Sequence, residues 1–199
     1  MNDDGLKGML TVWLYAFVRP RATFSAMVDT PRKYAGLVAL STLAVMYTIL
    51  FWVLASSKSV PSHTAGLITE PEMYYKTAAN YIFPLIGILW AMFLGVSHGL
   101  AKLFGGTGEF DAVVGALGIS YSLPILVFLV IPDIVFMAVG GHELLTASIR
   151  YTGALTAISL LVLSVHAIRG VHRIGWGGAI TSVVLGVVIQ APLAGWLIR

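Results

Sequence analysis

Cysteine is absent from this 199-residue chain, and charged residues are scarce. Without cysteine there can be no disulfide, thiolate nucleophile, iron–sulfur cluster or cysteine zinc site. Charged residues make up 11% of the chain and hydrophobic residues 58%, whereas a soluble domain carries about 25% charged residues. A chain of this size leaves much of its surface exposed, so a water-soluble fold could not hide this much apolar sequence. The composition predicts an integral membrane protein.

The apolar residues form long continuous runs, which do not alternate with period two as in a membrane β-barrel. Only helices and closed barrels satisfy their backbone polar groups in lipid, so these runs predict transmembrane helices and an all-α fold. Each has roughly 20 residues or more, enough for a hydrocarbon core of about 30 Å. The five expected spans cover residues 34–55, 78–104, 112–139, 145–168 and 176–198. We expect two parts, an N-terminal segment (1–33) and a transmembrane domain (34–199).

Residues 6–18 are predicted to form an amphipathic helix, which Pro20 ends. Its apolar residues recur at spacings of three and four and therefore share one face. This face is expected either to lie in the headgroup zone of the membrane or to pack beneath the bundle. No small-residue cleavage motif follows, so no signal peptide is predicted. The apolar face consists of Leu6, Met9, Leu10, Trp13, Leu14 and Phe17.

Basic residues are unevenly divided between the two sides of the predicted bundle. With the N-terminus inside, the cytoplasmic set is Lys7, Arg19, Arg21, Arg32, Lys33, Lys102, Arg169 and Arg173. The outer set is Lys58, Lys76, Arg150 and Arg199. Under the positive-inside rule, this distribution predicts a cytoplasmic N-terminus and an outer C-terminus.

The sequence also lacks the motifs of the common enzyme and nucleic-acid-binding classes. The glycine-rich turn at residues 105–108 has no following Lys-Ser/Thr and therefore does not match a phosphate-binding loop. His142-Glu143 has no second histidine at helical spacing. The G-x-S-x-G string at residues 95–99 lies inside an expected membrane span and not at a strand-to-helix turn, so it is not a nucleophile elbow. No soluble basic domain is available to bind nucleic acid. We therefore expect a non-enzymatic protein without a nucleic-acid partner.

Polar residues near the cytoplasmic ends of the spans form a candidate cation site. Imidazoles and carboxylates together can bind a divalent cation or pass protons. In the alternative interpretation the histidines bridge helix ends, the carboxylates start the third span, and nearby Lys and Arg side chains snorkel. No other cofactor is expected. The candidate metal ligands are His98, Glu109, Asp111 and His166.

Small residues at every fourth position predict close helix packing within the bundle, in preference to a dimer seam. On the second span these are Gly87, Ala91, Gly95 and Gly99. On the fifth span they are Gly178, Ser182, Gly186 and Ala194, with Gln190 at the position between the last two.

The depth of Asp133 can also be predicted. It lies about 32 Å along a helix from Ala112, so we expect it near the outer interface, exposed to water or paired with Arg150.

Several patterns occur in a characteristic order. The N-terminal helix leads through Pro20 to Thr23-Phe24, and a Gly-Gly-x-Gly-x-Phe turn (105–110) precedes the third span. That span contains Ser-Tyr-Ser-Leu-Pro (120–124), and Val-His-Ala-Ile-Arg-Gly (165–170) leads to the last span. Together these features resemble the Yip domain family (Ypt-interacting proteins), in particular its bacterial members. The resemblance covers nearly the whole chain.

The resemblance implies a five-helix bundle with a cytoplasmic N-terminus, in a bacterial cytoplasmic (inner) membrane. Eukaryotic members are associated with Rab-type small GTPases, vesicle budding and membrane shaping. This sequence lacks their long N-terminal tail, so a GTPase partner is implied only by analogy. The expected function is a membrane-organising or trafficking-like role through contacts with lipids, another membrane protein or a second copy of the chain. The alternative is a small transporter or channel for a divalent cation or protons.

Overall fold

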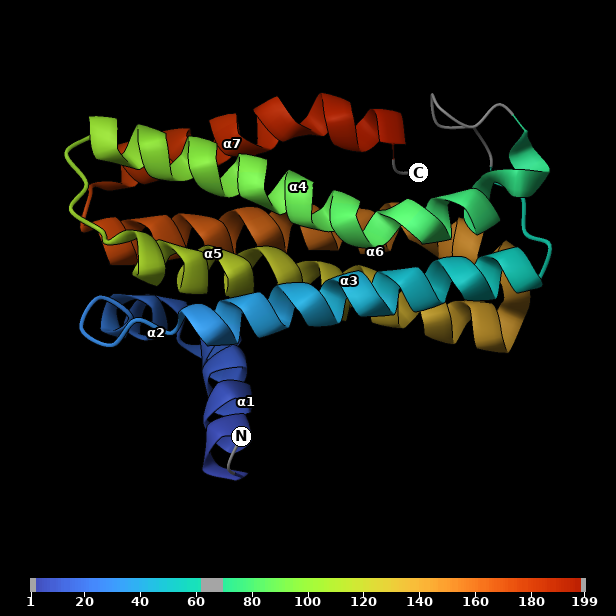
Figure 1. Cartoon of the computed structure of the whole chain (residues 1–199), viewed down its shortest axis with the longest axis horizontal. Coiled ribbons are helices and arrows are strands. Elements are labelled where there is room, and N and C mark those ends of the chain that lie inside the picture. The colour runs from blue at the N-terminus through green and yellow to red at the C-terminus, as the bar shows by residue number, and fades with distance from the viewer. Residues whose placement is uncertain (1–2, 62–69, 198–199) are drawn as a thin grey trace.

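The computed structural model describes residues 3–61 and 70–197, and within these ranges the chain is helical and contains no strand. Helices α3 to α7 run side by side as one bundle, and α1 crosses the direction of the bundle at one end (Figure 1). This arrangement confirms the predicted all-α membrane bundle. The helices are α1 (Asp3–Val18), α2 (Pro20–Ala26), α3 (Lys33–Ser56), α4 (Tyr74–Leu103), α5 (Phe110–Ile125), α6 (Ile131–His172) and α7 (Trp176–Leu197). A 3₁₀ turn, Pro71–Met73, precedes α4.

Four continuous helical stretches of the described chain are long and apolar enough to cross a membrane, and one of them is long enough to cross twice. This stretch, Phe110–His172, contains 63 residues. As a straight helix it would measure roughly 94 Å, about three times the hydrocarbon thickness. Gly141 interrupts it with a φ of 65° and a ψ of −160°, a conformation that glycine adopts without a Cβ clash. The chain turns back there, at the end of the bundle away from the start of α5, and the second arm of α6 returns alongside α5 (Figure 1). The bundle therefore has five membrane-length arms, as predicted.

Helix α1 divides its apolar residues between the bundle and the outside. The Trp13 indole N–H donates a hydrogen bond to the carbonyl of Ala35 at 3.2 Å. The rings of Phe17 and Phe128 pack in a T-shaped arrangement, with their centroids 5.8 Å apart. Leu10 and Leu14 are instead 52% and 63% exposed. One side of the helix therefore packs on the bundle, as in one of the two expectations. The other side faces outward, as a helix in the headgroup zone would. The side chain of Leu6 lies outside the described residues.

The closest helix contact joins the backbones of α3 and α5. A Cβ atom on Gly36 would lie 2.5 Å from the carbonyl oxygen of Gly115, and one on Gly118 would lie 2.6 Å from that of Gly36. Such distances require glycine, because no side chain lies between the helices that could move aside. Residues 112–124 of α5 are all buried. Helix α5 is therefore the central helix of the bundle, surrounded by protein.

The prediction of small-residue packing is confirmed for the fifth span and wrong for the second. A Cβ on Gly186 would collide with the Ser97 hydroxyl, and one on Gly178 would lie 3.1 Å from Phe104, so α7 packs on α4. On α4, a Cβ at Gly87, Gly95 or Gly99 would meet nothing within 4 Å. These glycines face outward, because the opposite side of α4, with Leu89 and Phe93, is the side that meets the bundle.

Candidate functional site

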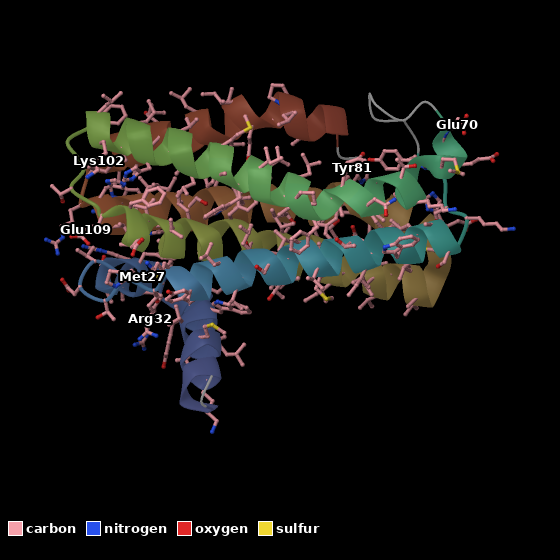
Figure 2. The ribbon with its side chains drawn as sticks, viewed as in Figure 1. Met27, Arg32, Glu70, Tyr81, Lys102 and Glu109 are labelled. Carbon is pink, nitrogen blue, oxygen red and sulfur yellow. The ribbon has the colours of Figure 1, made fainter. Side chains whose placement is uncertain are left out.

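One end of the bundle collects most of the basic side chains and all four predicted ligands. Here α2, the end of α4, the start of α5, the end of α6 and the start of α7 meet (Figure 1). Met27, Arg32, Lys102 and Glu109 lie at this end, and Glu70 lies at the other (Figure 2). We call it the basic end. Its basic residues on the bundle are Arg19, Arg21, Arg32, Lys33, Lys102, Arg169 and Arg173.

A pair of histidines lies at the centre of the basic end. His98 Nδ1 is 3.1 Å from Nε2 of His172, and the backbone N–H of Gly108 donates to His172 Nδ1 at 3.3 Å. His172 is 1% exposed. Because Gly108 donates to Nδ1, the proton of a neutral His172 must sit on Nε2, from which it donates to His98. The hydrogen bonds therefore fix both rings as neutral imidazoles, each with its proton on Nε2.

The glycine-rich turn between α4 and α5 wraps around this pair. Gly105 has a φ of 81°, in the left-handed region that favours glycine. A Cβ on Gly106 would lie 2.5 Å from His172 Nδ1 and 2.6 Å from the carbonyl oxygen of Ala101. The N–H of Thr107 also donates to the backbone carbonyl of His172 at 3.2 Å. The turn consists of glycines because its backbone lies directly against His172.

The four predicted ligands are distributed among separate contacts. His98 pairs with His172, a residue outside the predicted set. The Asp111 carboxylate accepts a hydrogen bond from Lys33 Nζ at 2.7 Å. The His166 ring packs on Trp176, with the two ring centroids 5.3 Å apart. Glu109 precedes α5 with its side chain exposed. Within the described part of the chain, no three His, Asp or Glu side chains are grouped to hold a metal ion; the cation site stays a prediction.

Two clefts flank the short helix α2. One, of about 370 Å³, lies between α1 and α2 and includes Tyr15, Arg19 and Arg32 in its lining. The other, of about 620 Å³, lies between α2 and α6 and is lined by Arg19–Ala22, Ser25 and His166. His166 Nδ1 is buried without a hydrogen-bond partner among the residues described. Arg19 lines both clefts, so each of them combines a cationic group with an apolar wall.

Few of the cations at this end are neutralised by carboxylates. The ion pairs among the described residues are Lys33 with Asp111, at 2.7 Å, and Arg173 with Asp29, at 3.9 Å. The guanidinium of Arg169 stacks over Trp176, 4.5 Å from the ring centroid. No carboxylate in the described ranges lies within 4.0 Å of the charged groups of Arg19, Arg21, Arg32, Lys102 or Arg169. The basic end therefore carries a net positive charge beside the two clefts.

Comparison with protein families identifies the chain. The sequence model of the Yip1 domain matches residues 14–198, a range that begins within α1 and includes all of α7. The chain belongs to the Yip1 domain family. A search of the curated proteins and a search of the solved structures each returned no match. The resemblance predicted from ordered motifs is thus confirmed.

The motifs that carry the Yip1 resemblance meet in space. Phe24 is fully buried, and a Cβ on Gly170 of α6 would lie 3.2 Å from it, so this glycine lets α2 lie close to α6. Two residues after Gly170, the His172 Nδ1 atom accepts a hydrogen bond from the Gly108 N–H of the glycine-rich turn. In the remaining motif, the Ser164 hydroxyl donates to that of Ser120 at 3.2 Å and joins α6 to α5. Three of the four Yip1 motifs therefore build the basic end.

The Asp133 side chain, on α6, is more buried in the protein than its sequence position suggested. It is 6% exposed, and Arg150 contacts the hydroxyl of Tyr151 instead. The expected exposed or Arg150-paired carboxylate is therefore wrong. The predicted position near the outer membrane interface stays a prediction, but the side chain is buried in the bundle and not exposed to water.

Proposed function

We propose that this Yip1-family protein is non-enzymatic and organises one membrane leaflet by binding anionic phospholipid at the basic end. The observation that carries this proposal is the group of arginines without carboxylate partners beside two clefts with apolar walls. A phospholipid has a phosphate for the guanidinium groups and acyl chains for the apolar surface. Arg19 and Arg21, which line the cleft between α2 and α6, are the expected phosphate-binding residues.

The position of α1 supports the same function. Apolar side chains exposed to water would be unfavourable in such number, whereas a helix in the headgroup zone buries them in acyl chains. Leu10, Leu14 and Val18 are all more than half exposed in the isolated protein. With the bundle spanning the bilayer, the crossing direction of α1 (Figure 1) places it parallel to the membrane surface. There it would insert between the headgroups of the leaflet that supplies the anionic lipid.

Lipid binding can be tested on the purified protein in detergent by titration with short-chain phosphatidylglycerol, phosphatidylcholine or inorganic phosphate. We expect tighter binding of phosphatidylglycerol than of phosphatidylcholine. The double variant Arg19→Gln/Arg21→Gln should weaken the binding of phosphatidylglycerol by about 10- to 30-fold, since each basic residue near an anionic surface contributes about 1 kcal/mol. Calorimetry of each titration measures the effect.

The matched control is Lys58→Gln/Arg150→Gln, which removes the same charge at the other end and should leave affinity unchanged. Equal losses in both double variants would mean that net charge alone attracts the lipid, against the proposed site. Binding of inorganic phosphate as tight as that of phosphatidylglycerol would identify a free anion as the ligand and contradict a lipid-organising function.

We further propose that the basic end faces the cytoplasm of a bacterial inner membrane, with the opposite end outside. The support is the positive-inside rule and the clustering of basic residues at one end; Arg199, assigned to the outer side, lies outside the described residues. The absence of cysteine allows a direct test with single-cysteine variants. In intact cells, a membrane-impermeant maleimide should label the Lys58→Cys variant. It should label Thr107→Cys only after permeabilisation, and the reverse pattern would overturn the orientation.

A further inference from the structure

The half of the bundle away from the basic end contains a cavity of about 440 Å³. Side chains from all five spans line it, and its wall is mainly apolar, with Leu89, Ile125 and Leu160 among the lining residues. The volume lies within the range of about 300–1,000 Å³ that is typical of small-molecule sites. No charged side chain lines it. The cavity therefore suits an uncharged, largely apolar ligand.

Two buried polar groups in this cavity lack partners. Thr156 on α6 and Gln190 on α7 both line it, and each is 7% exposed. The hydroxyl of Thr156 and the Oε1 atom of Gln190 have no hydrogen-bond partner in the described part of the protein. An unsatisfied polar group is unfavourable in hydrocarbon, where water is not available to pair with it. A ligand that hydrogen-bonds with these groups would remove this penalty.

The cavity lies at membrane depth. Gln190 is about 21 Å along α7 from Trp176, and Trp176 stands at the basic end beside Arg169. A hydrocarbon core is about 30 Å thick, so Gln190 lies past its middle. Gly153, which also lines the cavity, has no atom within 4 Å of where a Cβ would be. A ligand of a cavity at this depth would therefore enter from the lipid phase.

We propose that this cavity binds a neutral lipid with a free hydroxyl, of the diacylglycerol class. The acyl chains lie along the apolar wall, and the lipid hydroxyl donates to Gln190 Oε1. The Thr156 hydroxyl in turn donates to an oxygen of the lipid. Tyr47 and Tyr121, whose side chains also line the cavity, give its wall further polar character. This site is separate from the anionic-lipid site at the basic end and does not depend on it.

The test compares tritiated dioctanoylglycerol with its 3-O-methyl ether, which cannot donate a hydrogen bond. Saturable binding to the detergent-solubilised full chain is measured for both. We expect the wild type to bind the alcohol about tenfold more tightly than the ether. Gln190→Leu should weaken binding of the alcohol about tenfold and leave that of the ether unchanged. Gly153→Leu, which fills the cavity, should abolish both.

Asn80→Leu is the matched control, because the Asn80 amide is exposed and donates to its own helix at Lys76; its affinities should equal those of the wild type. Gln190→Leu should fold normally, since it replaces an unsatisfied polar group with an apolar one of similar size. Equal affinity of the wild type for alcohol and ether would overturn the hydroxyl assignment. Absence of saturable binding, or binding that survives Gly153→Leu, would overturn the cavity as the site.

Discussion

Gly118→Leu is expected to lower the thermal-unfolding midpoint by roughly 6 to 12 °C and to reduce the yield of folded protein. Even a Cβ at this position would lie 2.6 Å from the carbonyl oxygen of Gly36, and backbone cannot rotate out of the way as a side chain can. Overpacking commonly costs about 1–3 kcal/mol, and leucine pressed against backbone should cost the upper value, about 3 kcal/mol. At about 2–4 °C per kcal/mol in a chain of this size, this lowers the midpoint by about 6 to 12 °C. Circular dichroism in detergent measures the midpoint.

Gly95→Leu provides the matched control for that substitution. It places the same side chain on a membrane-spanning helix, but a Cβ at Gly95 meets nothing within 4 Å. Its midpoint should stay within a few degrees of the wild type. If the two variants were equally destabilised, the effect would come from leucine itself, and the backbone contact between α3 and α5 would not be the cause.

His172→Leu should destabilise the protein by about 2 kcal/mol or more. It removes the acceptor of the Gly108 N–H and the partner of His98, and each buried group left unpaired costs about 1–3 kcal/mol. Chemical denaturation measures the free energy of unfolding. His142→Leu is the matched control at the far turn: His142 Nδ1 is buried without a partner in the described residues, so its removal should be neutral or stabilising.

The same variant should also change how stability depends on pH. Protonation of either ring breaks one hydrogen bond, because the added proton must occupy Nδ1, where each ring is an acceptor. The folded protein therefore binds fewer protons than the unfolded chain, and stability falls as pH decreases from about 7.5 to about 5, past the ordinary pKa of histidine near 6.5. His172→Leu should show a weaker dependence. An unchanged dependence would show that the pair is not responsible.

The five crossings could be predicted because length and hydropathy determine which segments enter a bilayer. The turn at Gly141 followed from a break between two long apolar runs. Which face of a span meets protein was harder to predict, because lipid is as apolar as neighbouring helices. The small residues of α4 were therefore assigned to the wrong face, while Gly36, Gly115 and Gly118, on helices without an obvious ridge, form the closest contact.

The histidine pair shows why the candidate site was only partly predictable. His98 and His166 were predicted either to share a cation site or to bridge helix ends. The actual partner, His172, lies six residues further along α6 and outside the predicted span. The signal that could have revealed it is the glycine-rich turn, since consecutive small residues there indicate that something bulky lies against the backbone.

The reversal at Gly141 bears on how the chain is inserted during synthesis. The two arms on either side of it are joined without a polar loop, so there is no soluble segment that could be held on the far side while the second arm enters. His142 and Glu143 must cross the bilayer together at the tip of a helical hairpin. The hairpin should therefore enter the membrane as one unit. The charged residues at the end opposite the Gly141 turn would stay on the side of entry and set its orientation. In this respect the third and fourth spans form a single insertion event.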